Sequence, residues 1–397
     1  MQLFDTATGA VTPLTAPGSH VGMYVCGITP YDGGHIGHAF TYHTFDLITR
    51  RLRADGITVR SVRNVTDVDD DILRVARQRG VDFRTLGGAE AQRFDRDMAD
   101  LGLLSVEASP YATSRVPEMV QWIERLIDRG TAYDHEGWVY FDVERFPHYG
   151  ALSRLDPQTM IELSRTRGAN PDDQRKRNPL DFVLWQPSLV DEPSWPSPWS
   201  QGRPGWHIEC TVLSATELPL PIDIHGGGDD LIYPHHESEI AQALAAGVPR
   251  YVRHWVHVAM VGYQGEKMSK SVGNLVFVRE LLERVPAAVI RLMLCAHHHR
   301  RAWEYNDEEL TRAQSRWLAY QSAMTDGARF TSTDARALYD DFMARIDDDL
   351  DTPGALAILD EVADRATVRG HELGARVAGG QLMAPLLDIL GAPIVPS

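Results

Sequence analysis

The chain has 397 residues, of which 43% are hydrophobic and 24% are charged, as in ordinary globular proteins of two or three domains. Its net charge of −16 weighs against an extensive nucleic-acid surface, because phosphate backbones are bound by an excess of Lys and Arg. Three cysteines are too few for a secreted disulfide framework. The start carries no basic, apolar leader and no long apolar run follows, so we expect a cytoplasmic protein without a membrane partner.

The first elements along the chain predict a doubly wound α/β sheet. Residues 21–28 (VGMYVCGI) are an apolar run typical of a buried strand, and a glycine turn follows them. Residues 38–55 are apolar at helical spacing, and residues 57–68 predict a second strand. Strand, glycine turn, helix and strand open a Rossmann-type fold, in which ligands bind at the carboxyl ends of the parallel strands. Cys26 and the glycine turn lie at that end.

The remaining sequence predicts two further regions. Residues 110–205 interrupt the α/β rhythm with aromatic, Pro-rich and charged stretches, and the rhythm returns near residue 221. From about residue 305 onward the pattern is helical. We therefore predict a Rossmann-type catalytic domain over residues 1–305, with an insertion at 110–205 and a loop region at 255–305, followed by a small helical bundle over residues 306–397.

Two histidines follow the first predicted strand, in His35-Ile36-Gly37-His38. Glycines let the backbone approach a phosphate closely, and a helix N-terminus favours anions. Two imidazoles at such a turn can stabilise charge on the phosphates of a nucleotide. The alternative interpretation is a surface pair of histidines without a role.

A second polar motif, Lys-Met-Ser-Lys-Ser, occupies residues 267–271 between glycines. A loop of this kind can close over a polyphosphate and follow a leaving pyrophosphate. The alternative is an ordinary polar surface loop.

Side chains that suit zinc are scattered along the chain as Cys26, Cys210, His235 and Glu239. Their separation excludes a zinc finger, and we expect the strand ends to gather them. His235 and Glu239 are four apart, on one face of a predicted helix. Zinc here can bind a substrate thiolate, which discriminates against serine. The alternative for each thiol is a small buried hydrophobe, which we predict for Cys295, and we place the three histidines that follow it at the surface.

The two polar motifs in this order resemble the signature of class I aminoacyl-tRNA synthetases. Longer stretches, over nearly the whole chain, resemble cysteinyl-tRNA synthetase and its shorter relative, the mycothiol-pathway cysteine ligase. These stretches are MYVCGITPYD, RNVTDVDDD, RNPLDFVLW, EPSWPSPW, GRPGWHIEC, IHGGGDDLIYPHHESEIAQ and KMSKSVGNL. The resemblance implies that the carboxylate of L-cysteine attacks the α-phosphate of ATP to give cysteinyl-adenylate.

The resemblance also implies roles for individual residues. His35 and His38 would contact the phosphates, and Lys267 and Lys270 would stabilise the departing pyrophosphate with Mg²⁺. Cys26, Cys210 and His235 would bind zinc, with Glu239 as a fourth ligand. The positions that would hold cysteine and the adenylate are Gly27, Thr29, Gly37, Thr41, Asn64, Val65, Thr66, Trp206, Gly228, Asp229, Asp230 and Val261. For His236, Trp195 and Trp199 we expect packing or supporting roles.

The two families that the chain resembles differ in the molecule to which they transfer cysteine. Three features favour the ligase, which acylates the amine of glucosaminyl-inositol. They are Pro30, the Arg-Gly-Ala-Asn-Pro stretch at 167–171 and the lack of a basic segment after LLDILGAPIVPS. Glu239 and the Lys-Arg-Asn-Pro stretch at 176–179 resemble the synthetase, and Gly33-Gly34 is typical of neither. We predict the ligase, with tRNA or another amine acceptor as the alternative. The sequence leaves the oligomeric state open, and a monomer fits it.

Overall fold

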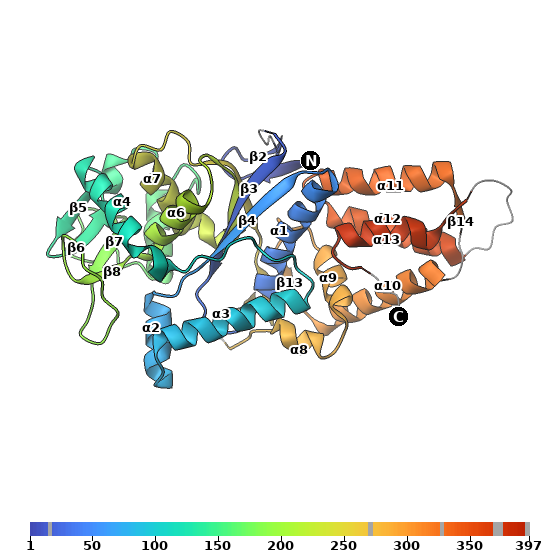
Figure 1. The fold of residues 1–397 in the computed structure, drawn as a ribbon, viewed down its shortest axis with the longest axis horizontal. Coiled ribbons are helices and arrows are strands. Elements are labelled where there is room, and N and C mark those ends of the chain that lie inside the picture. Colours follow the sequence, from blue (N-terminus) through green and yellow to red (C-terminus); the bar gives the residue numbers. More distant parts are fainter. Residues whose placement is uncertain (15–17, 269–272, 326–328, 368–375, 394–397) are drawn as a thin grey trace.

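A parallel sheet of four strands, in the order β10-β9-β3-β4, forms the centre of the protein (Figure 1). The computed structural model describes residues 1–14, 18–268, 273–325, 329–367 and 376–393. The strands are β3 (His20–Ile28), β4 (Thr58–Val65), β9 (Ile222–Gly228) and β10 (Val252–Val258). Met23 of β3 lies between Ser61 of β4 and Ile224 of β9 in register. The predicted α/β class and the first two predicted strands are therefore confirmed.

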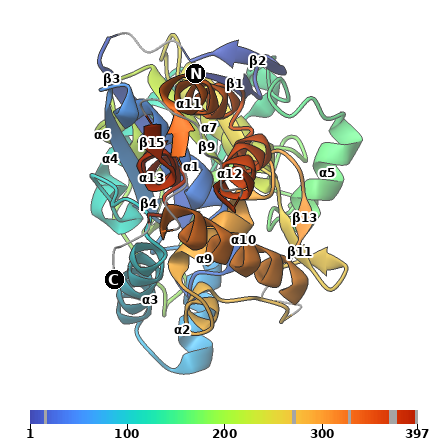
Figure 2. The same ribbon diagram turned by 90° about the vertical axis from the view of Figure 1, so that its right-hand side faces the viewer.

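Helices cover both faces of this sheet (Figure 2). Side chains alternate between the faces of a strand, so Met23 and Val25 join one hydrophobic core while Tyr24 and Cys26 join another. The first core is shared with α1 (Ile36–Ala54), which links β3 to β4, and the second with α6 and α7. The strand ends therefore carry different side chains on each face. The flanking elements are β1 (Gln2–Asp5), β2 (Ala10–Pro13), α2 (Asp70–Arg79), α3 (Phe83–Asp100), α6 (Trp206–Glu217) and α7 (Glu237–Ala245).

The segment between β4 and β9 holds a second, antiparallel sheet with strand order β5-β6-β7-β8. It lies at one end of the molecule, beside α4 and α6 (Figure 1). Trp195 and Trp199 pack against the core that this sheet shares with α6. The elements are α4 (Val116–Asp128), β5 (Ala132–His135), β6 (Trp138–Phe141), α5 (Pro157–Thr166), β7 (Phe182–Pro187) and β8 (Gly202–Pro204), with short 3₁₀ turns at Ala112–Arg115 and Val143–Arg145.

Helices dominate the C-terminal part of the chain, at the other end of the molecule (Figure 1). Phe342 of α11 and Leu356 of α12 belong to the same hydrophobic core as Ile36 of α1, so the domain division at residue 305 stays a prediction. The elements are β11 (Val261–Tyr263), β12 (Glu266–Lys267), α8 (Val278–Leu282), α9 (Ala287–Cys295), β13 (Trp303–Glu304), α10 (Asp307–Thr325), β14 (Arg329–Thr331), α11 (Ser332–Asp347), α12 (Thr352–Thr367), β15 (Arg376–Ala378) and α13 (Gly379–Ile389).

One sequence-based expectation about burial is wrong. Cys295 is fully buried, as predicted, with its sulfur 3.3 Å from Nε2 of His43. Of the three histidines after it, His299 is also buried, because it lies beneath His298 and Asp349 rather than at the surface. Within the described ranges, none of the helices combines the length and apolar composition needed to cross a bilayer.

Candidate active site

Four side chains from four separate segments meet in one buried cluster at the carboxyl end of the central sheet. Cys26 comes from the end of β3, Cys210 from α6, His235 from a kinked turn (Ile232–His236) and Glu239 from α7. Their ligand atoms lie within 4.8 Å of one another, and all four residues are buried. We call these residues the Cys/His/Glu cluster. The structure thus brings together the four residues that the sequence analysis selected.

Contacts within the cluster align its donor atoms. Nε2 of His235 is 3.2 Å from Oε1 of Glu239, and the thiol of Cys26 donates to the same oxygen at 3.5 Å. Burial raises the pKa of Cys26. Burial also opposes ionisation of Cys210, but the hydrogen bond with Cys26 and the nearby His235 outweigh it and lower the pKa of Cys210 to about 6. Two sulfurs, an imidazole and a carboxylate are a donor set that zinc prefers, so the residues present fit a zinc ion.

Two further residues contact the second carboxylate oxygen of Glu239. Oε2 of Glu239 accepts a hydrogen bond from the Tyr251 hydroxyl at 2.8 Å and lies 3.0 Å from Nε2 of His225. Burial alone would raise the pKa of Glu239, but His225 and His235 outweigh it and lower that pKa. The sequence analysis missed His225 and Tyr251. One feature of the sequence could have indicated His225: it directly precedes the triple glycine at a predicted strand end.

His236 supports the cluster from another side, as expected for it. Its Nε2 lies 3.3 Å from the sulfur of Cys26, and its Nδ1 lies 2.7 Å from Nε2 of His257. His257 in turn contacts the hydroxyl of Thr6 at 2.7 Å. Burial lowers the pKa of His257 to about 3. The neutral ring of His257 is thus contacted at both nitrogens, by Thr6 and by His236. These contacts set the orientation of His236.

Trp206 and His207 hold the ring of His235. The indole of Trp206 stacks on that imidazole with 4.2 Å between ring centroids, and Nδ1 of His207 lies 3.0 Å from Nδ1 of His235. Burial lowers the pKa of His207 well below its ordinary range. Trp206 was expected to line the cysteine pocket, and its stacking places the indole directly beside the cluster.

His35 and His38 form a stacked pair at the N-terminus of α1. Their ring centroids are 3.7 Å apart with 28° between the planes. His35 is the N-cap residue, and its Nδ1 accepts a hydrogen bond from the amide of Gly37 at 3.1 Å. A side chain at Gly34 would meet the terminal carbon of Met98 at 2.8 Å. Close packing against α3 therefore explains the second of the two glycines before the histidines.

The lysine motif is described only in part. The backbone of Lys267 lies in β12, paired with Gly262 of β11, whereas Lys270 lies outside the described residues. Beyond the lysine motif in the sequence, the backbone of Phe277 bridges to that of His35 in the histidine turn. The two motifs are therefore neighbours in space at this point.

Gly27 and Asn64 connect the ends of β3 and β4. The amide of Gly27 donates to Oδ1 of Asn64 at 2.7 Å, and Nδ2 of Asn64 donates to the hydroxyl of Thr66 at 3.1 Å. A Cβ on Gly27 would lie 1.6 Å from the carbonyl oxygen of Asn64. Thr29 continues this edge by donating to Asp69 at 2.8 Å. These predicted pocket residues therefore form one hydrogen-bonded edge.

The other predicted nucleotide-site positions lie on the same strand ends and on the first turns of helices. The guanidinium of Arg167 donates to the carbonyls of Asp230 and Tyr233, which fixes the turn between β9 and the cluster. Thr41 donates to the carbonyl of Gly37 within α1. Val65 is the last residue of β4, and Gly228 is the last residue of β9. Asp229 and Asp230 begin a 3₁₀ turn (Asp229–Leu231), and Val261 begins β11.

Comparison with known proteins identifies the class of this fold and site. The family described as tRNA synthetases class I (C) catalytic domain matches residues 14–315. The chain therefore belongs to the class I tRNA synthetase family. The solved structure of Mycobacterium tuberculosis methionyl-tRNA synthetase in complex with methionyl-adenylate has the same fold, with a TM-score of 0.66 at 17% identity over 94% of this chain and 89% of the other.

Within that family the chain is similar to a particular group of ligases. A protein of Streptosporangium roseum is 44% identical over 371 residues, which are 93% of this chain and 90% of that protein. A protein of Thermobifida fusca is 45% identical over 368 residues, which are 92% of this chain and 88% of that protein. Each is named L-cysteine:1D-myo-inositol 2-amino-2-deoxy-alpha-D-glucopyranoside ligase.

Proposed function

We propose that this chain is an ATP-dependent cysteine ligase of mycothiol biosynthesis. It joins L-cysteine to the amine of 1D-myo-inositol 2-amino-2-deoxy-alpha-D-glucopyranoside, with AMP and pyrophosphate as the other products. The observation that carries the proposal is the buried Cys/His/Glu cluster, assembled on a class I synthetase sheet, in a chain that is 44% and 45% identical to ligases of this name. An ATP-consuming reaction also suits the cytoplasmic location expected for the chain.

Cys26, Cys210, His235 and Glu239 are the residues that would hold zinc. When bound, zinc supplies a Lewis acid with affinity for the substrate thiolate, which serine cannot offer. Tyr251 and His225 orient Glu239, while Trp206 and His207 orient His235. The protein's contribution is thus a rigid, buried donor set whose ligands keep their positions before substrate enters.

The first half-reaction takes place beside the histidine turn. The cysteine carboxylate attacks the α-phosphorus of ATP, the bond to the β-phosphate breaks, and pyrophosphate leaves. His35 and His38, stacked at a helix N-terminus, bind the phosphates where negative charge grows. Lys267 and Lys270 stabilise the leaving pyrophosphate, and a bound Mg²⁺ would supply further positive charge there.

The second half-reaction forms an amide. The neutral amine of the sugar attacks the carbonyl carbon of cysteinyl-adenylate, the bond to AMP breaks, and the nitrogen releases a proton. Asp230 lies in the turn fixed by Arg167 and is the carboxylate that we place near the incoming amine.

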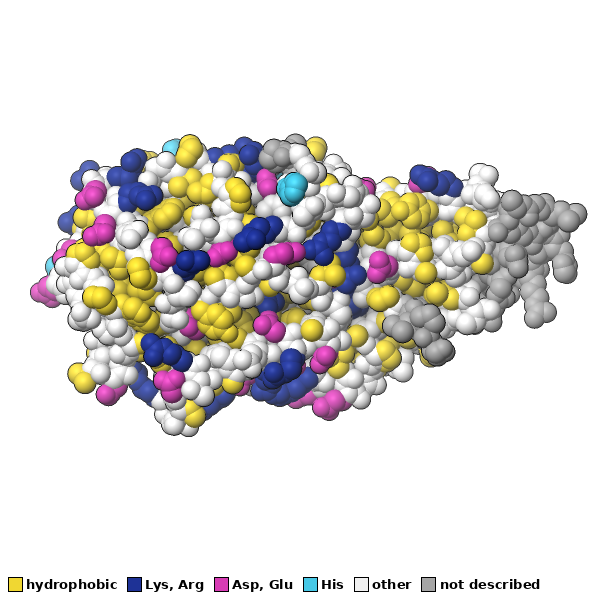
Figure 3. Space-filling view, in the orientation of Figure 1, with side chains coloured by type: hydrophobic (Ala, Val, Ile, Leu, Met, Phe, Trp, Pro, Cys, Tyr) yellow, Lys and Arg dark blue, Asp and Glu magenta, His cyan; other side chains and the backbone are white. Residues whose placement is uncertain are grey.

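Surface charge favours a small acceptor over tRNA. The face of the molecule in Figure 3 carries acidic and basic side chains intermingled, rather than a continuous basic stripe. Phosphate backbones require clustered positive charge. The net charge of −16 agrees with this preference.

The test offers zinc-loaded protein L-cysteine and ATP, with either glucosaminyl-inositol or tRNA, and identifies the cysteinylated product by mass. We expect cysteine-dependent ATP–pyrophosphate exchange without any acceptor, and transfer to the sugar amine. Transfer to tRNA alone would overturn the proposal that the sugar amine is the acceptor. Absence of exchange in zinc-loaded protein would overturn cysteine activation itself.

A further inference from the structure

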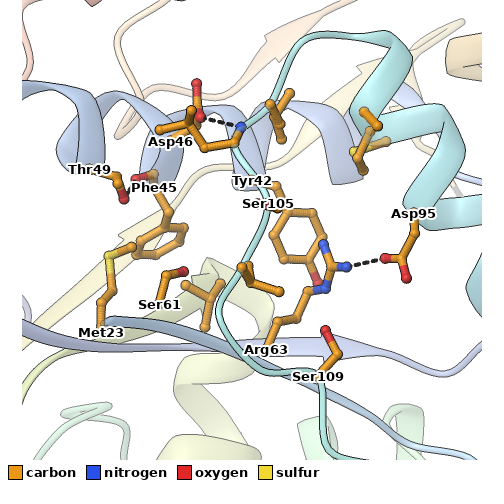
Figure 4. Close-up of a pocket in the computed structure, with 16 residues that line it drawn as sticks. Met23, Tyr42, Phe45, Asp46, Thr49, Ser61, Arg63, Asp95, Ser105 and Ser109 are labelled. Atoms are coloured by element: carbon orange, nitrogen blue, oxygen red, sulfur yellow. Dashed lines mark hydrogen bonds and ion pairs between the residues drawn. The ribbon is translucent and has the colours of Figure 1, made fainter. Parts of the chain in front are cut away.

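A cavity of about 360 Å³ lies between α1, α3 and the strands β3 and β4 (Figure 4). Met23 and Val25 of β3 line it, whereas Cys26 points to the opposite face of the same sheet. The cavity is therefore separate from the Cys/His/Glu cluster. None of the residues proposed above for zinc, cysteine or nucleotide lines it.

The cavity runs from exposed residues of α3 to a buried floor. Met23, Phe45 and Met98 are buried in its floor, while Asp95 and Ala99 of α3 are exposed at its rim. A volume of this size is within the range of small-molecule sites, which are about 300–1,000 Å³. Buried polar side chains also line it, namely Asp46, Thr49 and Ser61, so the lining suits a ligand that combines an apolar part with a polar end.

Arg63 supplies a positive charge inside this cavity. Its side chain is 9% exposed, and its guanidinium lies 5.2 Å from the ring centroid of Tyr42 and 4.8 Å from that of Phe94. Its ion-pair partner is Asp95 (Figure 4), and the side chain of Asp95 is 55% exposed. A buried cation needs an anionic partner, but an exposed carboxylate returns to water at low cost. Asp95 is therefore a replaceable partner for Arg63.

We propose that this cavity binds a small carboxylic acid with an apolar tail. The ligand carboxylate pairs with Arg63 in place of Asp95, and the tail occupies the floor formed by Met23, Phe45 and Met98. Arg recognises carboxylates through two parallel N–H donors, and burial of the tail is favourable because it removes apolar surface from water.

Two residues connect the cavity to the proposed catalytic groups: Tyr42, which lines it, and Phe94, which contacts Arg63. The hydroxyl of Tyr42 donates to the backbone carbonyl of Cys26 at 2.9 Å, and Phe94 contacts the ring of His38 edge-on, with 5.8 Å between centroids. A ligand that draws Arg63 away from both rings alters these two contacts. We expect saturating ligand to raise the KM for cysteine in the exchange reaction by about fivefold. This expectation rests on the proposed function.

Calorimetric titration of the full chain with phenylbutyrate, and with uncharged phenylbutanol as the matched probe, tests the binding. We expect phenylbutyrate to bind and phenylbutanol to bind at least about tenfold more weakly. Asp95→Asn should tighten phenylbutyrate by about two- to fivefold, the range of a surface ion pair. Asp100→Asn, which removes the same charge from the same helix outside the cavity, should leave the Kd unchanged.

Two blocking variants locate the site. Met98→Trp fills the floor, and Ala99→Phe narrows the exposed rim without entering the core, so the second stays informative if the first fails to fold. Each should abolish phenylbutyrate binding. Equal binding of both probes, or binding that survives Ala99→Phe, would overturn the proposal. An unchanged KM for cysteine at saturating phenylbutyrate would overturn the coupling, and a chain without exchange activity would overturn the proposed function while the titration still reports on the cavity.

Discussion

The backbone amide of Ile36 donates a hydrogen bond to the carbonyl of Val276, with 2.9 Å between nitrogen and oxygen. Ile36 begins α1 inside the histidine motif, and Val276 follows the lysine motif. The amide of Val278 returns a bond of 2.9 Å to the carbonyl of Gly34. These paired bonds attach residues 276–278, which follow the lysine motif in the sequence, to the turn that carries His35 and His38.

Replacement of His38 by alanine should slow adenylate formation without removing zinc. We expect kcat/KM of cysteine-dependent exchange to fall by about 10²–10³, because the stacked imidazole no longer meets the growing phosphate charge. Zinc content, measured by elemental analysis, should not change, since the Cys/His/Glu cluster lacks His38. His20→Ala, at the exposed start of β3, is the control. Loss of zinc in the His38 variant would mean that this residue is misplaced.

Tyr251→Phe should weaken zinc binding. The variant removes the hydroxyl that donates to Glu239, and loss of such an outer hydrogen bond costs about 10–100-fold in metal affinity. Competition with a chromophoric chelator measures the change. Tyr149→Phe is the matched control, because it removes a buried hydroxyl bonded to Ser238 rather than to a cluster residue. Equal zinc affinity in both variants would contradict the anchoring role of Tyr251.

Gly27→Ala should destabilise the fold, whereas Gly33→Ala should be tolerated. A Cβ at Gly27 would lie 1.6 Å from the carbonyl of Asn64, so β3 and β4 must separate, at a cost of about 3 kcal/mol or more. At Gly33 the nearest atom lies 3.5 Å away, which is ordinary contact. Chemical denaturation followed by circular dichroism compares the free energies of unfolding. Similar values for the two variants would refute the crowding at Gly27.

Asp69 should make stability fall as the pH rises from about 4 to 6. Burial raises its pKa to about 6, above the ordinary value of about 3.9. Over this window the folded chain binds more protons than the unfolded chain, so the free energy of unfolding decreases with rising pH, by at most about 3 kcal/mol.

The matched variant for this effect is Asp69→Asn, which keeps the cap on α2 but cannot titrate. Unfolding curves at several pH values should show a shallower decline for the variant than for the parent chain. Parallel pH profiles for the two proteins would show that Asp69 titrates normally when folded.

Much of the fold and of the candidate site followed from the sequence alone. The alternation of apolar strands, glycine turns and helices in the first 68 residues determined the α/β class, because these local patterns match the period of each element. The cysteine, histidine and glutamate of the cluster were selected by residue type and by resemblance. Helices α2 and α3 were not predicted individually, whereas α13 lies within the predicted helical region.

Only the tertiary structure decided which side chains surround these groups. His225 and Tyr251 reach Glu239 because β9 and the start of β10 pack beneath α7, and no spacing along the chain encodes that meeting. The burial of His299 and the cavity beside Arg63 have the same origin. The sequence by itself determined the chemistry of the individual residues and the order of the elements, whereas packing between distant segments determined which residues share a charge, a hydrogen bond or a cavity.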